Sequence, residues 1–168
     1  MRAAVNPVEL SITIARPRQE VFDYLADIAN HPEFTDHFLT RWHLTRVQSY
    51  GRGAGARFQV NAPFQRFNWA DLTLAEVDSP RRILELGRTG KFNRIRLFAE
   101  YVLDPAPGGG TRVRFRTETE PTLPTDRLME ALGLRRWTRA RYGKALRRLR
   151  AILEDGEERG QRATIAPG

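Results

Sequence analysis

The sequence ends in a long amphipathic helical pattern, and this pattern limits the possible folds more than any other feature. Apolar residues recur at steps of three and four positions from Tyr142 to Leu153, which places them along one face of an α-helix. Arginine and lysine occupy the other faces. We predict one helix from Asp126 to Glu154, bent at Gly133, because glycine costs about 1 kcal/mol relative to alanine inside a helix. Such a helix needs an apolar surface to lie on.

The segments before this helix have the patterns of strands. Alternation is clearest near the end, where Val113 and Phe115 lie on one face and arginines on the other. Pro17 opens a short helix after the first strand, and residues 29–36 form a second one. The predicted strands are residues 9–15, 38–50, 56–62, 66–77, 82–88, 94–103 and 112–120.

These elements predict an α+β fold in which a seven-stranded antiparallel sheet wraps around the long C-terminal helix. Short turns join most consecutive strands, which favours antiparallel pairing, and two short helices separate the first and second strands. Rows of arginine mark one sheet face as solvated, so the other face must be covered by the terminal helix. We expect one domain over residues 8–155 and a frayed, disordered tail over residues 156–168.

Composition narrows the functional classes. The chain of 168 residues contains no cysteine, which excludes a disulfide framework, a thiolate metal site and a cysteine nucleophile. No apolar run approaches the roughly 20 residues of a membrane-spanning helix, and the first residues lack the apolar core of a signal peptide. We therefore expect a cytoplasmic protein. The net charge of +8 favours anionic partners in general.

The three histidines do not have the spacing of a metal site. His31, His37 and His43 are six residues apart, unlike the helical or clustered pairs of zinc motifs. We expect surface or loop positions for them, with no metal and no cofactor.

Three carboxylates are candidates for acid–base chemistry. Asp71, Glu85 or Glu100 would have a raised pKa if desolvated in a cavity. Asp71 shares the alternation of Trp69 and is the best placed, although a surface carboxylate is the simpler interpretation. Glu100 alternates with arginines and is expected to face water. No catalytic residue is assigned on this basis.

The start of the long helix combines arginines with Trp137 and Tyr142, a composition also found in nucleic-acid-binding segments. No helix-turn-helix, zinc-finger or RNP-type motif accompanies it, so we do not expect nucleic acid as a partner. An anionic membrane surface is an alternative partner. Arg135 or Arg139 would hold a ligand carboxylate if it faced a cavity; otherwise both are solvated.

Six short segments, in this order along the chain, resemble the SRPBCC superfamily of START-like, helix-grip proteins. Within it they are closest to the bacterial polyketide cyclase/dehydrase and lipid-transport group. The matching segments are residues 14–25, 30–34, 53–58, 78–83, 109–113 and 146–154. Each is weak alone, whereas together they are fairly specific for the fold.

The resemblance implies a deep apolar cavity between the sheet and the terminal helix. On the residues alone, a solid core is the favoured interpretation. Fixed polar groups in such a cavity would come from Tyr101, Thr117 and Thr119. The alternation does not decide which face of the sheet carries Trp42. The residues expected to line it and bind the ligand are Phe58, Val60, Trp69, Ile95, Leu97, Tyr101, Val113, Phe115, Thr117, Tyr142 and Leu146.

Three functions are consistent with these patterns. The first is binding of a hydrophobic or amphipathic small molecule, lipid-like or polyketide-like, in the cavity. The second is a polyketide aromatase/cyclase or dehydratase that acts in the same cavity. The third is an interaction protein that uses the basic face of the terminal helix. The sequence does not indicate an oligomeric state.

Overall fold

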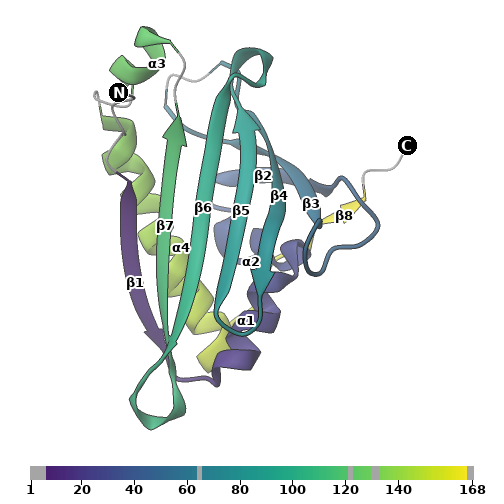
Figure 1. Cartoon of the computed structure of the whole chain (residues 1–168), viewed down its shortest axis with the longest axis vertical. Coiled ribbons are helices and arrows are strands. Elements are labelled where there is room, and N and C mark those ends of the chain that lie inside the picture. The colour runs from purple at the N-terminus through teal and green to yellow at the C-terminus, as the bar shows by residue number, and fades with distance from the viewer. Residues whose placement is uncertain (1–6, 64–65, 121–122, 130–132, 166–168) are drawn as a thin grey trace.

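The computed structural model describes residues 7–63, 66–120, 123–129 and 133–165. Figure 1 shows a curved sheet with the long helix α4 lying across one face and α1 and α2 near one end of that helix. The helices are α1 (Arg18–Ala26), α2 (His31–Thr35), α3 (Pro124–Met129) and α4 (Arg135–Asp155). The strands are β1 (Val8–Ile14), β2 (Leu39–Leu44), β3 (Gly55–Val60), β4 (Trp69–Asp78), β5 (Arg82–Thr89), β6 (Ile95–Pro105), β7 (Thr111–Glu120) and β8 (Thr164–Ile165).

The strands of the described residues form one sheet in the order β1-β7-β6-β5-β4-β3-β2-β8. Neighbours are antiparallel, except that β8 runs parallel to β2. The large antiparallel sheet, the two short helices between β1 and β2 and the long C-terminal helix confirm the predicted helix-grip class. The eighth strand, formed by two residues, is a minor difference.

The two faces of the sheet differ as the alternation predicts. In β7, Val113 and Phe115 are buried, whereas Arg112, Arg114 and Arg116 are exposed. The buried face packs against α4, whose side chains Ala145, Leu146, Leu149, Ile152 and Leu153 are buried. The predicted apolar stripe of the terminal helix is therefore confirmed.

The second strand is much shorter than predicted. β2 ends at Leu44 instead of continuing to residue 50, and its pairing with β3 shifts between Thr40 and His43. Arg41 lies in the irregular stretch with a positive φ of 53°. An irregularity of this kind redirects neighbouring side chains. The indole of Trp42 stacks on Phe58, with ring centroids 4.2 Å apart.

The predicted single helix from Asp126 is described as two helices. α3 ends at Met129 and α4 begins at Arg135, while residues 130–132 lie outside the described part. Gly133 has a φ of +115°, a conformation that side-chain-bearing residues rarely adopt. The described helices are therefore separated by a stretch that includes Gly133, where the sequence predicted one bent helix. None of the described helices combines the length and apolar character needed to cross a bilayer.

The C-terminal end of α4 is tied to the segment that follows β1. The Arg16 side chain donates to the carbonyl oxygens of Leu153 and Glu154, at 2.6 and 3.0 Å. The last carbonyls of a helix lack helical partners, and a cation there also complements the helix dipole. Gly156 ends the helix in a left-handed conformation. α4 is thus fixed across the sheet at this end.

Part of the expected disordered tail packs against the fold. Ala163 is buried, and its N–H donates to the carbonyl of Ala29 at 2.9 Å. Arg162 contacts Asp27 and Asn30, and Thr164–Ile165 pair with β2. An alanine between polar residues gives little sign of burial in the sequence. Residues 166–168 lie outside the described part.

Candidate functional site

A cavity of about 120 Å³ lies between the inner face of the sheet and the first turns of α4. It is partly open to solvent. An engineered apolar cavity of roughly 150 Å³ holds benzene, so this space suits a ring-sized group. Six of the residues predicted to line it do so: Phe58, Val60, Leu97, Tyr101, Thr117 and Tyr142.

Several residues predicted to line the cavity lie on the sheet or on α4 but outside the cavity wall. Val113 and Leu146 are buried in the core, and the ring of Phe115 packs behind Tyr101 and Tyr142, at centroid distances of 4.9 and 4.6 Å. Ile95 is half-buried at the start of β6 and is also absent from the wall. The cavity therefore occupies only part of the inner face, and the rest is solid packing.

Trp69 and Asp71 lie on the outer face, so the predicted cavity position of Trp69 is wrong, and Asp71 is the surface carboxylate of the simpler interpretation. Ala70 pairs with Phe58, which faces the cavity, and the neighbouring positions on β4 must therefore face away. Asp71 lies 3.7 Å from the Arg57 guanidinium, which also covers the Trp69 ring at 5.1 Å. Alternation showed that the two residues share a face, but it did not show which face.

Glu85 is the carboxylate that lines the cavity. It is 3% exposed, and it pairs across the sheet with Ala99, another wall residue. Glu100 instead forms an ion pair with Arg82. The sequence contained a signal for this arrangement, because Glu85 shares the alternation of the apolar residue Ile83 on a short strand.

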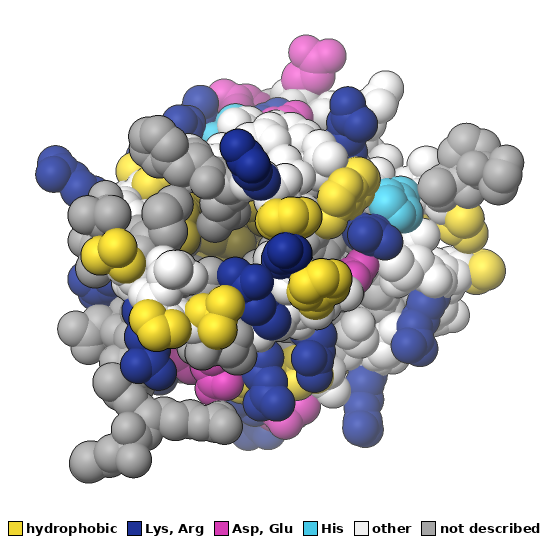
Figure 2. Space-filling view, turned by 90° about the horizontal axis from the view of Figure 1, so that it is seen from above, with side chains coloured by type: hydrophobic (Ala, Val, Ile, Leu, Met, Phe, Trp, Pro, Cys, Tyr) yellow, Lys and Arg dark blue, Asp and Glu magenta, His cyan; other side chains and the backbone are white. Residues whose placement is uncertain are grey.

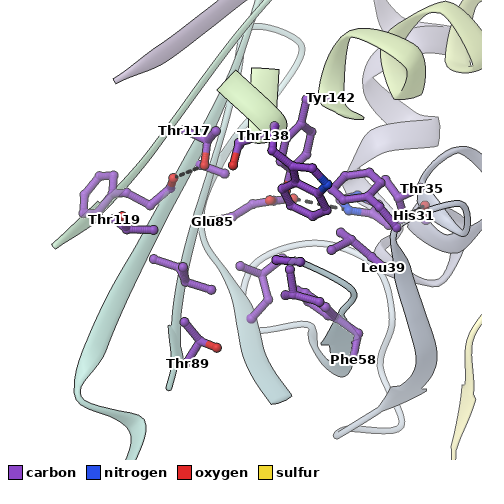
Figure 3. Close-up of a pocket in the computed structure, with 18 of the residues that line it drawn as sticks. His31, Thr35, Leu39, Phe58, Glu85, Thr89, Thr117, Thr119, Thr138 and Tyr142 are labelled. Carbon is purple, nitrogen blue, oxygen red and sulfur yellow. Dashed lines mark hydrogen bonds and ion pairs between the residues drawn. The ribbon is translucent and has the colours of Figure 1, made fainter. Parts of the chain in front are cut away.

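His31 faces Glu85 from the start of α2 (Figure 3). The prediction of a surface or loop position is wrong for this residue, which is 2% exposed. Its Nε2 lies 2.9 Å from the carbonyl oxygen of Leu25. A carbonyl can only accept, so Nε2 carries the proton and Nδ1 of the neutral ring is an acceptor. The Nδ1 atom lies 3.4 Å from Oε1 of Glu85.

Burial makes both members of this pair neutral near pH 7. Desolvation lowers the pKa of His31 to about 4, although the hydrogen bond to Leu25 opposes this shift. Desolvation raises the pKa of Glu85 to about 8. The contact is therefore not an ion pair. Its length exceeds the usual range of about 2.7–3.2 Å for such hydrogen bonds, and Oε1 of Glu85 has no hydrogen-bond partner.

Neither of the two arginines considered for a ligand carboxylate faces the cavity. Arg135 donates to the carbonyl of Pro7 and Arg139 to that of Glu9, at 3.1 and 3.3 Å. Both side chains are exposed beside the start of the chain. Leu134, Trp137 and Thr138 are the neighbouring residues that reach the wall.

The other two histidines have separate surroundings. His37 lies 3.1 Å from the carbonyl oxygen of Arg141, and His43 packs against Trp69. Within the described ranges, no group of three or more histidine, aspartate or glutamate side chains is arranged to hold a metal ion.

Apolar side chains are exposed where the β5–β6 and β3–β4 connections meet. Phe67 and Phe92 are 55% and 87% exposed, and Lys91 Nζ lies 5.8 and 5.2 Å from their ring centroids. Thr89, just before this turn, and Ala62 both line the cavity. Figure 2 looks onto this end of the molecule and shows apolar side chains among lysine and arginine. We call Phe67, Lys91 and Phe92 the rim.

The fold and the site together define a helix-grip protein with an internal apolar cavity. A family model described as polyketide cyclase/dehydrase and lipid transport matches residues 7–154, and the chain belongs to this family. The comparison with curated protein sequences finds no match.

Solved structures of similar fold have low sequence identity to this chain. TTHA0849 from Thermus thermophilus is 15% identical, with a TM-score of 0.67, over 91% of this chain and 100% of that one. The KanY protein is 17% identical, with a TM-score of 0.68, over 90% and 98%. Truncated norcoclaurine synthase from Thalictrum flavum is 10% identical, with a TM-score of 0.66, over 91% and 96%. At these identities the similarity shows the fold alone.

Proposed function

We propose that the protein binds a hydrophobic or amphipathic small molecule, lipid-like or polyketide-like, in the cavity between the sheet and α4. The observation that carries this proposal is the composition of the cavity wall. Aromatic rings, including the stacked pair Trp42 and Phe58, surround a few fixed polar groups. Small-molecule sites are typically concave and apolar, with a small number of placed polar groups. Membership of the family supports the same class of ligand.

Cavity filling tests this proposal. Ala99 lies on the wall, so Ala99→Trp should displace a bound ligand, whereas Ala140→Trp on the exposed side of α4 is a control of equal chemistry. We expect saturable Nile red fluorescence with the wild type and the control, and at least tenfold weaker binding to Ala99→Trp. Circular dichroism would verify that both variants are folded. Absence of saturable binding to the wild type would contradict the proposal.

The buried carboxyl supports a second candidate function, that of a polyketide cyclase or dehydratase. Catalytic acids and bases work best when their pKa lies near the operating pH, and burial raises the pKa of Glu85 to about 8. Glu85 would take a proton from the substrate carbon or give one to a leaving hydroxyl. Positioning of a folded chain by the walls would supply the rest of the catalysis.

A pair of substitutions separates binding from catalysis. Glu85→Gln preserves the shape but removes the titrating group, whereas Asp71→Asn alters an outer-face carboxylate. If the protein is an enzyme, turnover of a polyketide-like substrate should fall at least a hundredfold in Glu85→Gln and stay unchanged in Asp71→Asn. Equal turnover in both variants would rule out Glu85 as the acid or base.

We also propose that the ligand enters from an anionic membrane surface. The rim places two exposed phenylalanines and a lysine beside the wall residues Thr89 and Ala62. Apolar side chains with basic neighbours suit the boundary between acyl chains and anionic headgroups. The net charge of +8 has the sign that such a surface requires.

A further inference from the structure

We propose that the His31–Glu85 pair is a subsite for a neutral hydroxyl group, so that the ligand is a ring-sized phenol or alcohol whose O–H donates to the Glu85 carboxyl. This inference rests on the proposed function, because it specifies the ligand of the same cavity. It starts from Oε1 of Glu85, a buried polar atom without a hydrogen-bond partner on the cavity wall. A buried acceptor left unsatisfied is costly, so a ligand that supplies a donor gains affinity there.

Several neighbouring side chains have already committed their protons to the backbone. The hydroxyls of Thr35, Thr89 and Thr117 donate to the carbonyls of His31, Trp69 and Phe98. The remaining lone pairs of these hydroxyls can only accept. Figure 3 shows Thr117 with its bond to Phe98, on the same cavity as Glu85.

Two of the ring N–H groups that line the cavity, those of His31 and Trp42, are also bonded to backbone carbonyls. His31 Nε2 donates to Leu25, and Trp42 Nε1 donates to Leu39 at 3.0 Å. The neutral Glu85 carboxyl holds one proton, and His31 Nδ1, 3.4 Å from Oε1, is the acceptor that faces it. With that proton turned toward Nδ1, the carboxyl offers only acceptor lone pairs to a ligand. Burial raises the pKa of the Tyr101 and Tyr142 phenols, so both hydroxyls keep their protons. Each can donate and accept a hydrogen bond, and neither discriminates between ligands. Next to Glu85 and His31, the side chains whose protons are already bonded to the backbone favour a ligand that donates.

The charges of the wall exclude an anionic head group at this position. No lysine or arginine is among the described residues that line the cavity. A carboxylate or phosphate would therefore lose its hydration without gaining a cation, which is strongly unfavourable. An ammonium group would donate, but it would pair with an ionised Glu85 carboxylate. Burying these two charges together costs desolvation free energy that offsets much of their attraction. A neutral hydroxyl meets the acceptors without either cost.

Matched ligands test the hydroxyl directly. Isothermal titration calorimetry at pH 6.5 would compare 4-pentylphenol with 4-pentylanisole, which has the same ring, tail and oxygen but no donor. We expect the phenol to bind the wild type about tenfold more tightly, as one net hydrogen bond gives. We expect 4-pentylbenzoate and 4-pentylbenzylamine to bind more weakly than the phenol.

Variants at Glu85 assign the preference to this residue. Glu85→Gln can donate its amide to His31 Nδ1 and keep its carbonyl as an acceptor, so it should retain the preference for the phenol. Glu85→Leu removes the acceptor and should bind phenol and anisole equally. If Glu85→Leu does not fold, Glu85→Met serves the same purpose with an unbranched side chain.

The outcomes separate this inference from the proposed function. Equal binding of phenol and anisole by the wild type would overturn the hydroxyl subsite while leaving the cavity as a ligand site. Tighter binding of the benzoate or the amine, or a preference that persists in Glu85→Leu or Glu85→Met, would also overturn it. If no compound binds and Nile red also fails, the proposed function itself is wrong, and the subsite is refuted with it.

Discussion

Glu85 and His31 face each other on one wall, and burial moves their pKa values in opposite directions. The Glu85 carboxyl ionises near its ordinary pKa of 4.5 in the unfolded chain but near 8 in the folded protein. Between these values the unfolded state binds fewer protons, so stability falls as the pH rises. His31 has the reverse effect at lower pH. Its neutral form contributes stability above pH 6.5, which is lost as the pH falls toward 4.

Between pH 6.5 and 8, the pH dependence of stability contributed by this pair therefore comes mainly from Glu85. Urea unfolding at these two pH values should show the wild type losing up to about 2 kcal/mol relative to Glu85→Gln, since one differentially bound proton gives about 1.4 kcal/mol per pH unit. Asp71→Asn should follow the wild type. A stability difference between wild type and Glu85→Gln that stays constant over this interval would show that Glu85 is not held in its neutral form.

Single residues also show where the sequence was sufficient. Alternation placed Val113, Phe115 and Tyr101 on the buried face, because a side-chain period of two is a property of every strand. Assigning Trp69 and Asp71 to a face required the pairing of Ala70 with Phe58, which is a contact between strands. His31 was missed because one histidine in a short helix carries no periodic signal. Its burial depends on three elements that meet at the cavity.

At the scale of elements, α4 is held at its C-terminal end by Arg16, which donates to two terminal carbonyls. Arg16→Ala should lower the free energy of unfolding by about 1–3 kcal/mol, because hydrogen bonds from a charged group are among the stronger ones. Arg150→Ala, on an exposed position of the same helix, is the matched control and should change stability by less than about 0.5 kcal/mol. Equal effects in urea unfolding would show that Arg16 does not anchor the helix.

The segment after α4 gives a second prediction at this scale. Ala163 is buried against the carbonyl of Ala29, whereas Gln161 is exposed two residues earlier. Ala163→Arg should destabilise the protein by about 1–3 kcal/mol through overpacking, and Gln161→Arg should have little effect. If both variants unfold at the same urea concentration as the wild type, the segment does not pack as described.

The elements differ in how far the sequence determined them. Strong alternation predicted β1, β6 and β7 to within one or two residues, and the apolar stripe predicted α4. The early end of β2 depends on an irregular stretch at Arg41, which has a positive φ. The sequence gives no sign of this conformation, because the residue is not a glycine. β8 depends on pairing with a distant strand, because two residues have no pattern of their own.

For the whole molecule, the rim and the net positive charge predict attachment to anionic vesicles. The wild type should co-sediment with vesicles that contain phosphatidylserine and not with pure phosphatidylcholine, and added salt should weaken the binding. Phe92→Asp should reduce it several-fold. Val47→Asp changes a similarly exposed apolar residue in the loop after β2 and should leave it unchanged. Equal loss in both variants would show that the rim is not the docking surface.

The central claim is that the cavity holds an apolar or amphipathic small molecule, and native mass spectrometry of freshly purified protein tests it most directly. We predict a discrete added mass that solvent extraction recovers as a lipid-like or polyketide-like compound, and that is depleted in Ala99→Trp but retained in Ala140→Trp. A bare protein that also fails to take up Nile red would contradict the claim and would leave the surface of the molecule as the place to look for its function.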